Sequence, residues 1–104
     1  RDRSPSRGLG DVYKRQGLSV YIGTLLPIEG WRTYAPFREE LKNQVNEWIR
    51  LTDGFEGCID FDLAVQDPDH PAAFKAGYDS GDHLHPSGAG YKAMADAVPK
   101  SFLY

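Results

Sequence analysis

Residues 36–52 carry the clearest hydrophobic pattern of the chain. Their apolar side chains recur at spacings of three and four residues and would share one face of an α-helix: Phe37, Leu41, Val45, Trp48 and Ile49. Charged and amide residues fill the other positions, as on a solvated face. Pro36 suits the first position of a helix, and Asp53-Gly54 favours its end. The pattern predicts an amphipathic helix whose apolar stripe, Trp48 included, packs into the core.

Two short apolar segments flank this helix. Residues 18–26 are rich in aliphatic, β-branched and aromatic side chains and stop before Pro27. Residues 57–62 are the second segment, in which Asp60 and Asp62 alternate with apolar side chains. The first is typical of a buried strand in a parallel sheet. A strand, a helix and a strand at this spacing predict a right-handed βαβ unit with two adjacent parallel strands.

The last part of the chain predicts one more helix. Residues 63–79 show no single period, whereas Ser87 can cap a helix over residues 88–98. Four side chains of that helix share one face: Tyr91, Met94, Ala95 and Val98. Pro99 cannot continue the helix without a kink. Residues 100–104 are apolar enough to pack on the sheet.

Residues 1–16 do not fit the rest of the chain. They hold five basic residues, little apolar content and no hydrophobic period. Residues 11–16 resemble the translation of a transposon end used in preparing sequencing libraries. We interpret residues 1–16 as non-native and residues 17–104 as the domain. A basic arm is the alternative.

Charge and composition exclude several classes of function. The net charge is −3, and without the basic first segment it becomes more negative, which is a poor surface for nucleic acid. No apolar run approaches the ~20 residues of a membrane span. A single cysteine, Cys58, excludes an internal disulfide framework but does not fix the compartment.

The chemistry gathers in residues 80–91. Asp82 precedes His85 by three residues, so that a turn can bring the carboxylate to one ring nitrogen. That contact would fix the tautomer of the ring and leave the other nitrogen free to take a proton. Pro86 keeps the residue before it out of the helical region, and Ser87 then starts the last helix.

A second segment, Asp67-x-x-His70-Pro71, has the same spacing. No capping residue follows Pro71, whereas Ser87 follows Pro86 directly. This difference favours Asp82 and His85 as the site. His83 lacks an aspartate three residues before it, and we interpret it as a loop residue near the rim of the pocket.

The pattern Asp-x-x-His-Pro before a glycine-containing helix start resembles the last motif block of the SGNH/GDSL family of esterases and lipases. Residues 18–91 are similar to the C-terminal portion of such an enzyme. The resemblance implies an α/β fold, a three-layer α/β/α sandwich with a parallel sheet, SGNH-hydrolase or flavodoxin-like, of which only the C-terminal part is present. It also implies that His85 is the general base of a Ser-His-Asp triad and that Asp82 is its partner.

The same resemblance indicates what this chain lacks. The family's first block with the nucleophilic serine is absent, as are the glycine and the Gly-x-Asn of the blocks that build the oxyanion hole. We therefore interpret residues 17–104 as the C-terminal fragment of an SGNH hydrolase domain, inactive by itself. The implied substrate is a small-molecule, carbohydrate or lipid ester, and neither a cofactor nor a metal is expected.

Two other classes of function remain open. Mixed nitrogen and oxygen donors cluster near the motif and would suit a metal-binding module: Asp79, Asp82, His83 and His85. A non-catalytic α/β interaction domain is the second alternative, in which the motif is only structural. Asp60 and Asp62 could also bind a metal, although two such residues more often cap a neighbouring helix. Trp31, in the loop after the first strand, either packs over the sheet end or contacts substrate.

Overall fold

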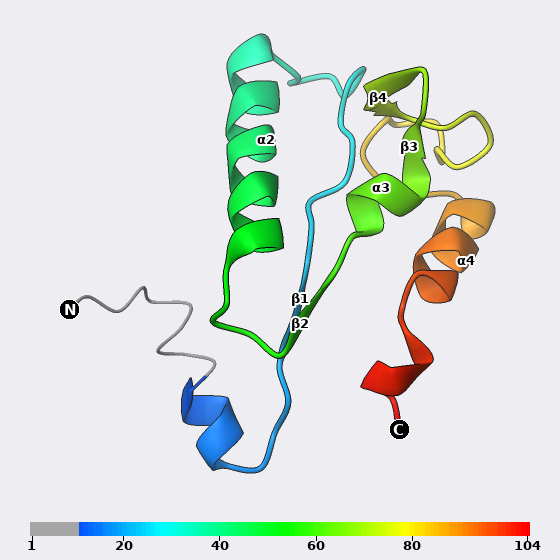
Figure 1. The fold of residues 1–104 in the computed structure, drawn as a ribbon. Coiled ribbons are helices and arrows are strands. Elements are labelled where there is room, and N and C mark those ends of the chain that lie inside the picture. The colour runs from blue at the N-terminus through cyan, green and yellow to red at the C-terminus, as the bar shows by residue number, and fades with distance from the viewer. Residues whose placement is uncertain (1–10) are drawn as a thin grey trace.

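The computed structural model describes residues 11–104 (Figure 1). Its strands and helices come in this order: β1 (Tyr21–Gly23), α2 (Pro36–Leu51), β2 (Gly57–Ile59), α3 (Phe61–Val65), β3 (Gln66–Asp67), β4 (His70–Phe74), α4 (Gly88–Asp96) and the 3-10 turn η1 (Lys100–Phe102). Residues 11–15 are also helical. Most of the segment 1–16, which the sequence predicts to be non-native, lies outside the described residues.

The predicted parallel strand pair is present but short. β1 and β2 pair in parallel with Tyr21 opposite Gly57, Ile22 opposite Cys58 and Gly23 opposite Ile59. β1 covers only the centre of residues 18–26, because the backbone of Leu25 turns to α2 instead of to a strand. β2 ends at Ile59, because Asp60 starts a helix: its carboxylate accepts the N–H of Leu63 and caps α3.

Helix α2 occupies the predicted residues, but the face that packs is turned away from the predicted stripe and shares only Ile49 with it. Phe37 is 60% and Trp48 43% exposed, and Leu41 and Val45 are exposed as well. The prediction that the apolar stripe lies in the core is therefore wrong for Trp48 and the three stripe residues before it, and holds only for Ile49. The buried residues of α2 are Lys42, Asn46 and Ile49, three positions that share a different face of the helix.

Hydrogen bonds account for this orientation of α2. The Asn46 side chain accepts the N–H of Leu25 at 2.7 Å and donates to its carbonyl oxygen at 2.9 Å. It thus takes the place of a neighbouring strand at the point where β1 ends. Asn46 itself is only 1% exposed, so this amide is a buried link between α2 and the end of β1.

Ion pairs extend the polar contact along α2. Arg50 binds Asp60 through two hydrogen bonds, of 2.8 and 3.0 Å, and reaches Asp62 at 3.1 Å. Thr24 donates to Asp60 and accepts the N–H of Asp62, which ties the end of β1 to α3. Burial raises the pKa of Asp62, whereas at Asp60 burial acts the same way but the bonds from Arg50 and Leu63 outweigh it and lower the pKa.

Residues 63–79, which show no clear pattern in the sequence, contain the end of α3 and the hairpin β3–β4. The two strands are antiparallel, with Gln66 opposite Phe74 and Asp67 opposite His70. Val65 and Phe74 are buried there and, with Ile49 of α2, form the apolar core of the described residues. The hairpin contributes Phe74 and α3 contributes Val65 to this core, neither of which the sequence pattern revealed.

The C-terminal helix and tail agree largely with the sequence prediction. The Ser87 hydroxyl accepts the N–H of Gly90 and caps α4. Phe102 stacks on Tyr21 of β1, with ring centroids 3.9 Å apart, so the tail packs on the sheet as predicted. A side chain at Gly57 would meet the Phe102 ring at 2.7 Å. Tyr91 is exposed, so the predicted apolar face of α4 is only partly packed.

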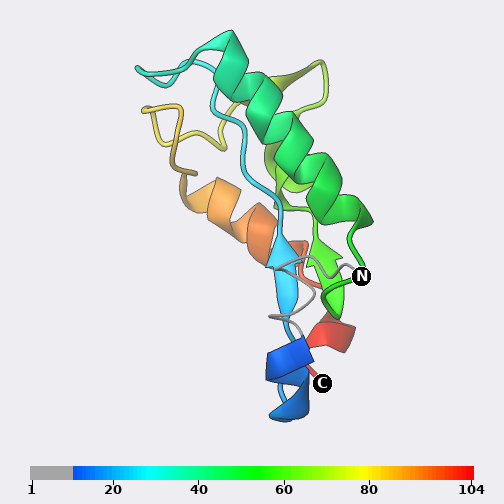
Figure 2. The same cartoon turned by 90° about the vertical axis from the view of Figure 1, so that its left-hand side faces the viewer.

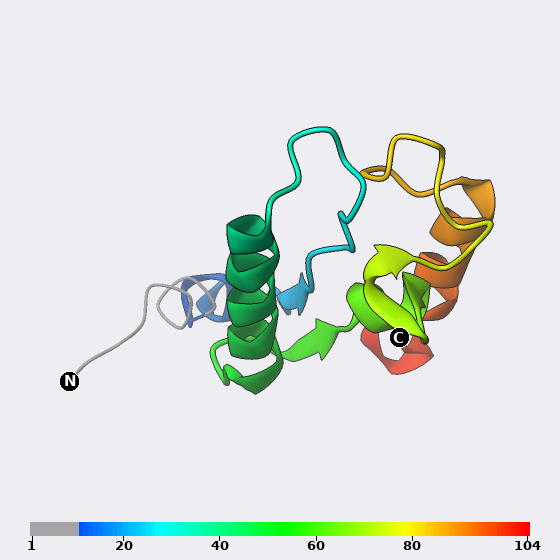
Figure 3. The ribbon, with the colours of Figure 1, turned by 90° about the horizontal axis from the view of Figure 1, so that it is seen from above.

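The elements form layers around the short parallel sheet. The β1–β2 pair lies between α2 on one side and α4 on the other (Figures 1 and 3). This is the layer order of the predicted α/β/α sandwich. Within residues 11–104, however, the sheet has two strands and a separate hairpin, so the three-layer parallel sheet itself is not formed. No helix in this part of the chain is long and apolar enough to cross a membrane.

Candidate active site

The loop between β4 and α4 lies at the end of the molecule toward which β1 and β2 point (Figures 1 and 2). Its two arms are held together by the backbone: the N–H of Ser87 bonds the carbonyl of Tyr78 at 2.8 Å, and the N–H of Ser80 bonds that of His85 at 3.0 Å. An antiparallel bridge joins Asp79 to Pro86. The loop thus sits at the carboxyl edge of the parallel strands, where sites of open α/β sheets gather.

Asp82 and His85 make the contact that their spacing predicts. The Oδ2 atom of Asp82 lies 2.6 Å from Nδ1 of His85. The other carboxylate oxygen accepts the backbone N–H groups of Leu84 and His85 at 2.9 and 2.8 Å, and the hydroxyl of Ser80 at 3.0 Å. The bond from the His85 ring, followed by the bonds from these N–H groups, holds the pKa of Asp82 well below its ordinary value.

The His85 ring is open to solvent on its far side. Its side chain is 63% exposed, and its Nε2 has no hydrogen-bond partner among residues 11–104. A carboxylate can only accept, so Nδ1 carries the proton when the ring is neutral and Nε2 is left with a free lone pair. This arrangement can accept a proton at Nε2 and stabilise the resulting imidazolium through Asp82.

A second aspartate–histidine pair stands next to the first. The Oδ2 atom of Asp79 lies 2.5 Å from Nδ1 of His83, and its Oδ1 accepts the N–H groups of Gly81 and His83. Partial burial acts to raise the pKa of Asp79, but these bonds outweigh it and lower the pKa. The Asp-x-x-His spacing does not indicate this pair, because here the aspartate stands four residues before the histidine and not three.

The competing segment does not form such a pair. His70 contacts the Glu29 carboxylate instead, and Asp67 accepts the N–H of Asp69 at 2.9 Å. The reason lies in the hairpin, in which Asp67 and His70 flank the tight turn between β3 and β4. Asp67 thus bonds within the turn, and the His70 ring contacts Glu29 in the loop after β1. The choice of Asp82 over Asp67 as the histidine's partner agrees with this geometry.

Other chemistry-bearing residues lie apart from the two rings. Among residues 11–104 no serine bonds a histidine ring; Ser80 donates to Asp82, and Ser87 donates to the carbonyl of Gly77. Within the same residues no group of three or more His, Cys, Asp or Glu is arranged to hold a metal ion. Cys58 lies on β2, where burial raises the pKa of its thiol.

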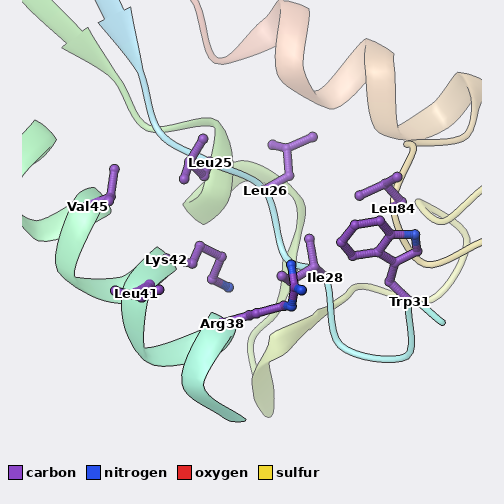
Figure 4. Close-up of a pocket in the computed structure, with 9 residues that line it drawn as sticks. All are labelled: Leu25, Leu26, Ile28, Trp31, Arg38, Leu41, Lys42, Val45 and Leu84. Atoms are coloured by element: carbon purple, nitrogen blue, oxygen red, sulfur yellow. The ribbon is translucent and has the colours of Figure 1, made fainter. Parts of the chain in front are cut away.

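An apolar cavity of about 460 Å³ opens beside the site loop. Figure 4 shows Trp31 and Leu84 side by side at one end of it, and Leu41 and Val45 of α2 at the other. Leu84 directly precedes His85, so the cavity reaches the site loop. Trp31 thus packs against that loop at the end of the sheet, as the first of its two interpretations has it.

One comparison with known proteins identifies the family. The model of the family described as GDSL-like Lipase/Acylhydrolase matches residues 9–98, which is most of the chain. The chain belongs to this family. The matched region of this GDSL hydrolase chain runs from before β1 to the end of α4 and contains both aspartate–histidine pairs of the site loop. No curated protein matches the chain.

The family, as its description says, is one of lipases and acylhydrolases. The resemblance seen in the sequence motif is therefore confirmed at the level of the family. The match begins at residue 9, inside the segment that we interpret as non-native. The α/β character of the fold agrees with the family.

Proposed function

We propose that Asp82 and His85 are the aspartate and histidine of a Ser-His-Asp triad that hydrolyses carboxylic esters. The observation that carries this proposal is the 2.6 Å contact between the Asp82 carboxylate and Nδ1 of a histidine whose far side is exposed. The lowered pKa of Asp82 keeps the carboxylate charged at neutral pH, so that it can orient the ring and stabilise the imidazolium.

The proposed reaction follows from this geometry. A serine hydroxyl attacks the ester carbonyl carbon while Nε2 of His85 takes its proton. The imidazolium then gives that proton to the oxygen of the leaving alcohol, and an acyl-serine remains. Water, deprotonated by the same nitrogen, attacks the acyl carbon; the bond from that carbon to the serine oxygen breaks, the imidazolium returns the proton to this oxygen, and the carboxylic acid leaves. The substrate class is a small-molecule, carbohydrate or lipid ester.

The serine nucleophile comes from another segment of the domain in this proposal. No serine in residues 11–104 pairs with a histidine ring, so this part of the chain offers a base without its nucleophile. The exposed stripe of α2 supplies a surface for that segment. Within the described residues β1 pairs only with β2, so its other edge offers a place for a further strand. We therefore interpret residues 17–104 as the C-terminal part of a GDSL hydrolase domain.

The test uses the complete reading frame that contains this chain. Hydrolysis of p-nitrophenyl acetate is measured for the intact protein and for His85→Ala, which should lower kcat by on the order of 10⁴-fold or more. The matched control is His70→Ala, which removes the histidine of the other Asp-x-x-His-Pro segment and should leave kcat nearly unchanged. A serine-directed phosphonate should label the intact protein.

Three outcomes would contradict the proposal. Equal losses for the two histidine variants would show that the site loop has no special role. Absence of phosphonate labelling in a well-folded intact protein would favour an interaction domain. Hydrolysis by the 104-residue chain alone that His85→Ala abolishes would show that no further segment is needed.

A further inference from the structure

His83 adopts a backbone conformation that residues other than glycine rarely take. Its φ angle is +60°, and among residues 11–104 it is the only residue other than glycine with a positive φ. A non-glycine residue in this region is strained and persists only where the surroundings hold it there. Only Leu84 stands between His83 and the candidate base His85, so the cause of the strain bears on the site.

Asp79 contacts both the backbone and the side chain of His83 and so keeps it in this conformation. One of its carboxylate oxygens accepts the N–H of His83 at 3.0 Å, while the other lies 2.5 Å from the ring nitrogen Nδ1 of the same residue. A single carboxylate therefore fixes both the backbone and the side chain of His83. Asp79 is itself anchored by its backbone bridge to Pro86, the residue after His85.

The loop after β1 holds the other side of the His83 ring. A Cβ atom at Gly30 would lie 2.9 Å from the ring, closer than such contacts ever occur, so the ring lies against the backbone of Gly30. Gly30 has a φ of +99°, which a glycine adopts without strain. Figure 3 shows the loop after β1 and the loop before α4 meeting at this end of the molecule.

The conformation of His83 sets the direction of the next two residues. Their N–H groups, those of Leu84 and His85, both point to the Oδ1 atom of Asp82. The chain bends at His83, and in this conformation both N–H groups reach that atom. If His83 left its strained conformation, these donors would turn away from Asp82, and the Asp82 carboxylate would lose its alignment with the His85 ring.

We infer that Asp79 and His83 are positioning residues, which lock the site loop against the loop after β1 and thereby hold His85 in the tautomer that leaves Nε2 free. The inference rests on the proposed role of His85 as the base. It assigns no contact with substrate to His83. The ring of His83 packs against Gly30 in the loop after β1, and Asp79 holds that ring in place.

The test reads the tautomer of His85 directly in the 104-residue chain. Long-range ¹H–¹⁵N spectra at about pH 8.5, where an ordinary imidazole is neutral, report which ring nitrogen carries the proton. The native chain should show His85 protonated at Nδ1. His83→Ala should shift the tautomer ratio of His85 toward that of the same chain unfolded in urea.

Two further variants separate the ring from the backbone. His83→Asn keeps a residue that tolerates positive φ but removes the ring, and it should shift the His85 ratio as His83→Ala does. His70→Ala is the matched control, because it removes another histidine–carboxylate contact to the loop after β1, and it should leave the ratio unchanged. Amide dispersion of α2 and α4 verifies that each variant is folded.

Each outcome decides the inference. A native ratio in both His83 variants would overturn it. A native ratio in His83→Asn alone would also overturn it, because the backbone and not the braced ring would then be responsible. A shift in both variants with none in His70→Ala supports it. The tautomer is read without any hydrolysis assay, so failure of this coupling and failure of the proposed ester hydrolysis are separate results.

Discussion

Two aspartates satisfy the polar groups of the site loop. Asp79 accepts the N–H groups of Gly81 and His83, and Asp82 accepts those of Leu84 and His85, while each carboxylate also binds one imidazole. A loop of this kind has no strand or helix to bond its backbone, so side-chain carboxylates take that role. The loop therefore keeps its conformation only while Asp79 and Asp82 are ionised.

The loop should consequently keep its structure to unusually low pH. The pKa of Asp82 in the folded chain lies below the ordinary value of about 3.9, so its stabilising effect is present above that pH and is lost as pH falls through the folded pKa. The amide shift of His85, followed by NMR, should therefore change with a midpoint well below about pH 4. Asp82→Asn should show no such transition. A midpoint near the ordinary value in the native chain would contradict the tight pairing of Asp82.

The chemistry of this loop could be predicted from sequence only in part. The spacing of Asp82 and His85 is short enough that one turn determines their contact, and the contact is present. The pair of Asp79 and His83 was not foreseen, because it depends on a positive φ that ordinary turn spacing does not indicate. The His83 ring contacts Gly30, which lies in a loop far away in the sequence. A local sequence pattern cannot predict a contact of this kind.

Helix α2 meets the sheet through a polar face. Asn46 bonds the backbone at Leu25, and Arg50 reaches the two aspartates at the start of α3. These bonds join three elements, namely the end of β1, the helix and α3. Because Asn46 is buried, its bonds are sheltered from water, and their loss leaves polar groups of Leu25 without a partner.

Asn46→Ala should therefore destabilise the chain by roughly 2 kcal/mol, since two hydrogen bonds are lost at a buried amide. Urea unfolding followed by circular dichroism measures the change. Asn43→Ala is the matched control: this asparagine lies one turn earlier on α2 and is exposed, so its loss should cost within about 0.5 kcal/mol. Similar effects of the two substitutions would show that the bonds to Leu25 contribute nothing to stability.

The spacing of apolar residues predicted the position of α2 in the chain but not the face of the helix that packs. The stripe that begins at Phe37 gave the helix its bounds, because period and capping are local properties. The face that packs depends on which partners lie nearby, and here a buried amide and an ion pair face the strand. The hairpin β3–β4 escaped prediction for a related reason: β3 has two residues, too few to show a period.

As a whole, residues 11–104 bury few apolar side chains and expose many. The buried hydrophobic residues of this part of the chain are Ile49, Val65 and Phe74, whereas the other four residues of the α2 stripe are exposed. A chain with so small a core is marginally stable, and an apolar stripe of this length invites association. In the complete domain that we propose, the same stripe would be covered.

Replacing two stripe residues should test this assignment. Leu41→Glu with Trp48→Glu should reduce self-association of the 104-residue chain, measured by sedimentation, while α2 stays helical. The same double substitution should destabilise the complete protein, because it places charges in a packed interface.

A matched control separates charge from apolar area. Asn43→Asp with Gln44→Glu adds two negative charges to α2 without altering the stripe, and it should change association much less. If both double variants reduced self-association equally, net charge and not the stripe would be its cause.

The amide of Asn46 has one more consequence, which concerns rotation. An α-helix advances by about 100° per residue, so the position that bonds the strand also sets the angular phase of every other residue. The amide mimics a peptide unit and fits the backbone of Leu25 in one orientation only. One side chain thus fixes the rotation of a 16-residue helix about its own axis. Moved by a single position, the same amide would present a different surface of the helix to whatever lies beyond.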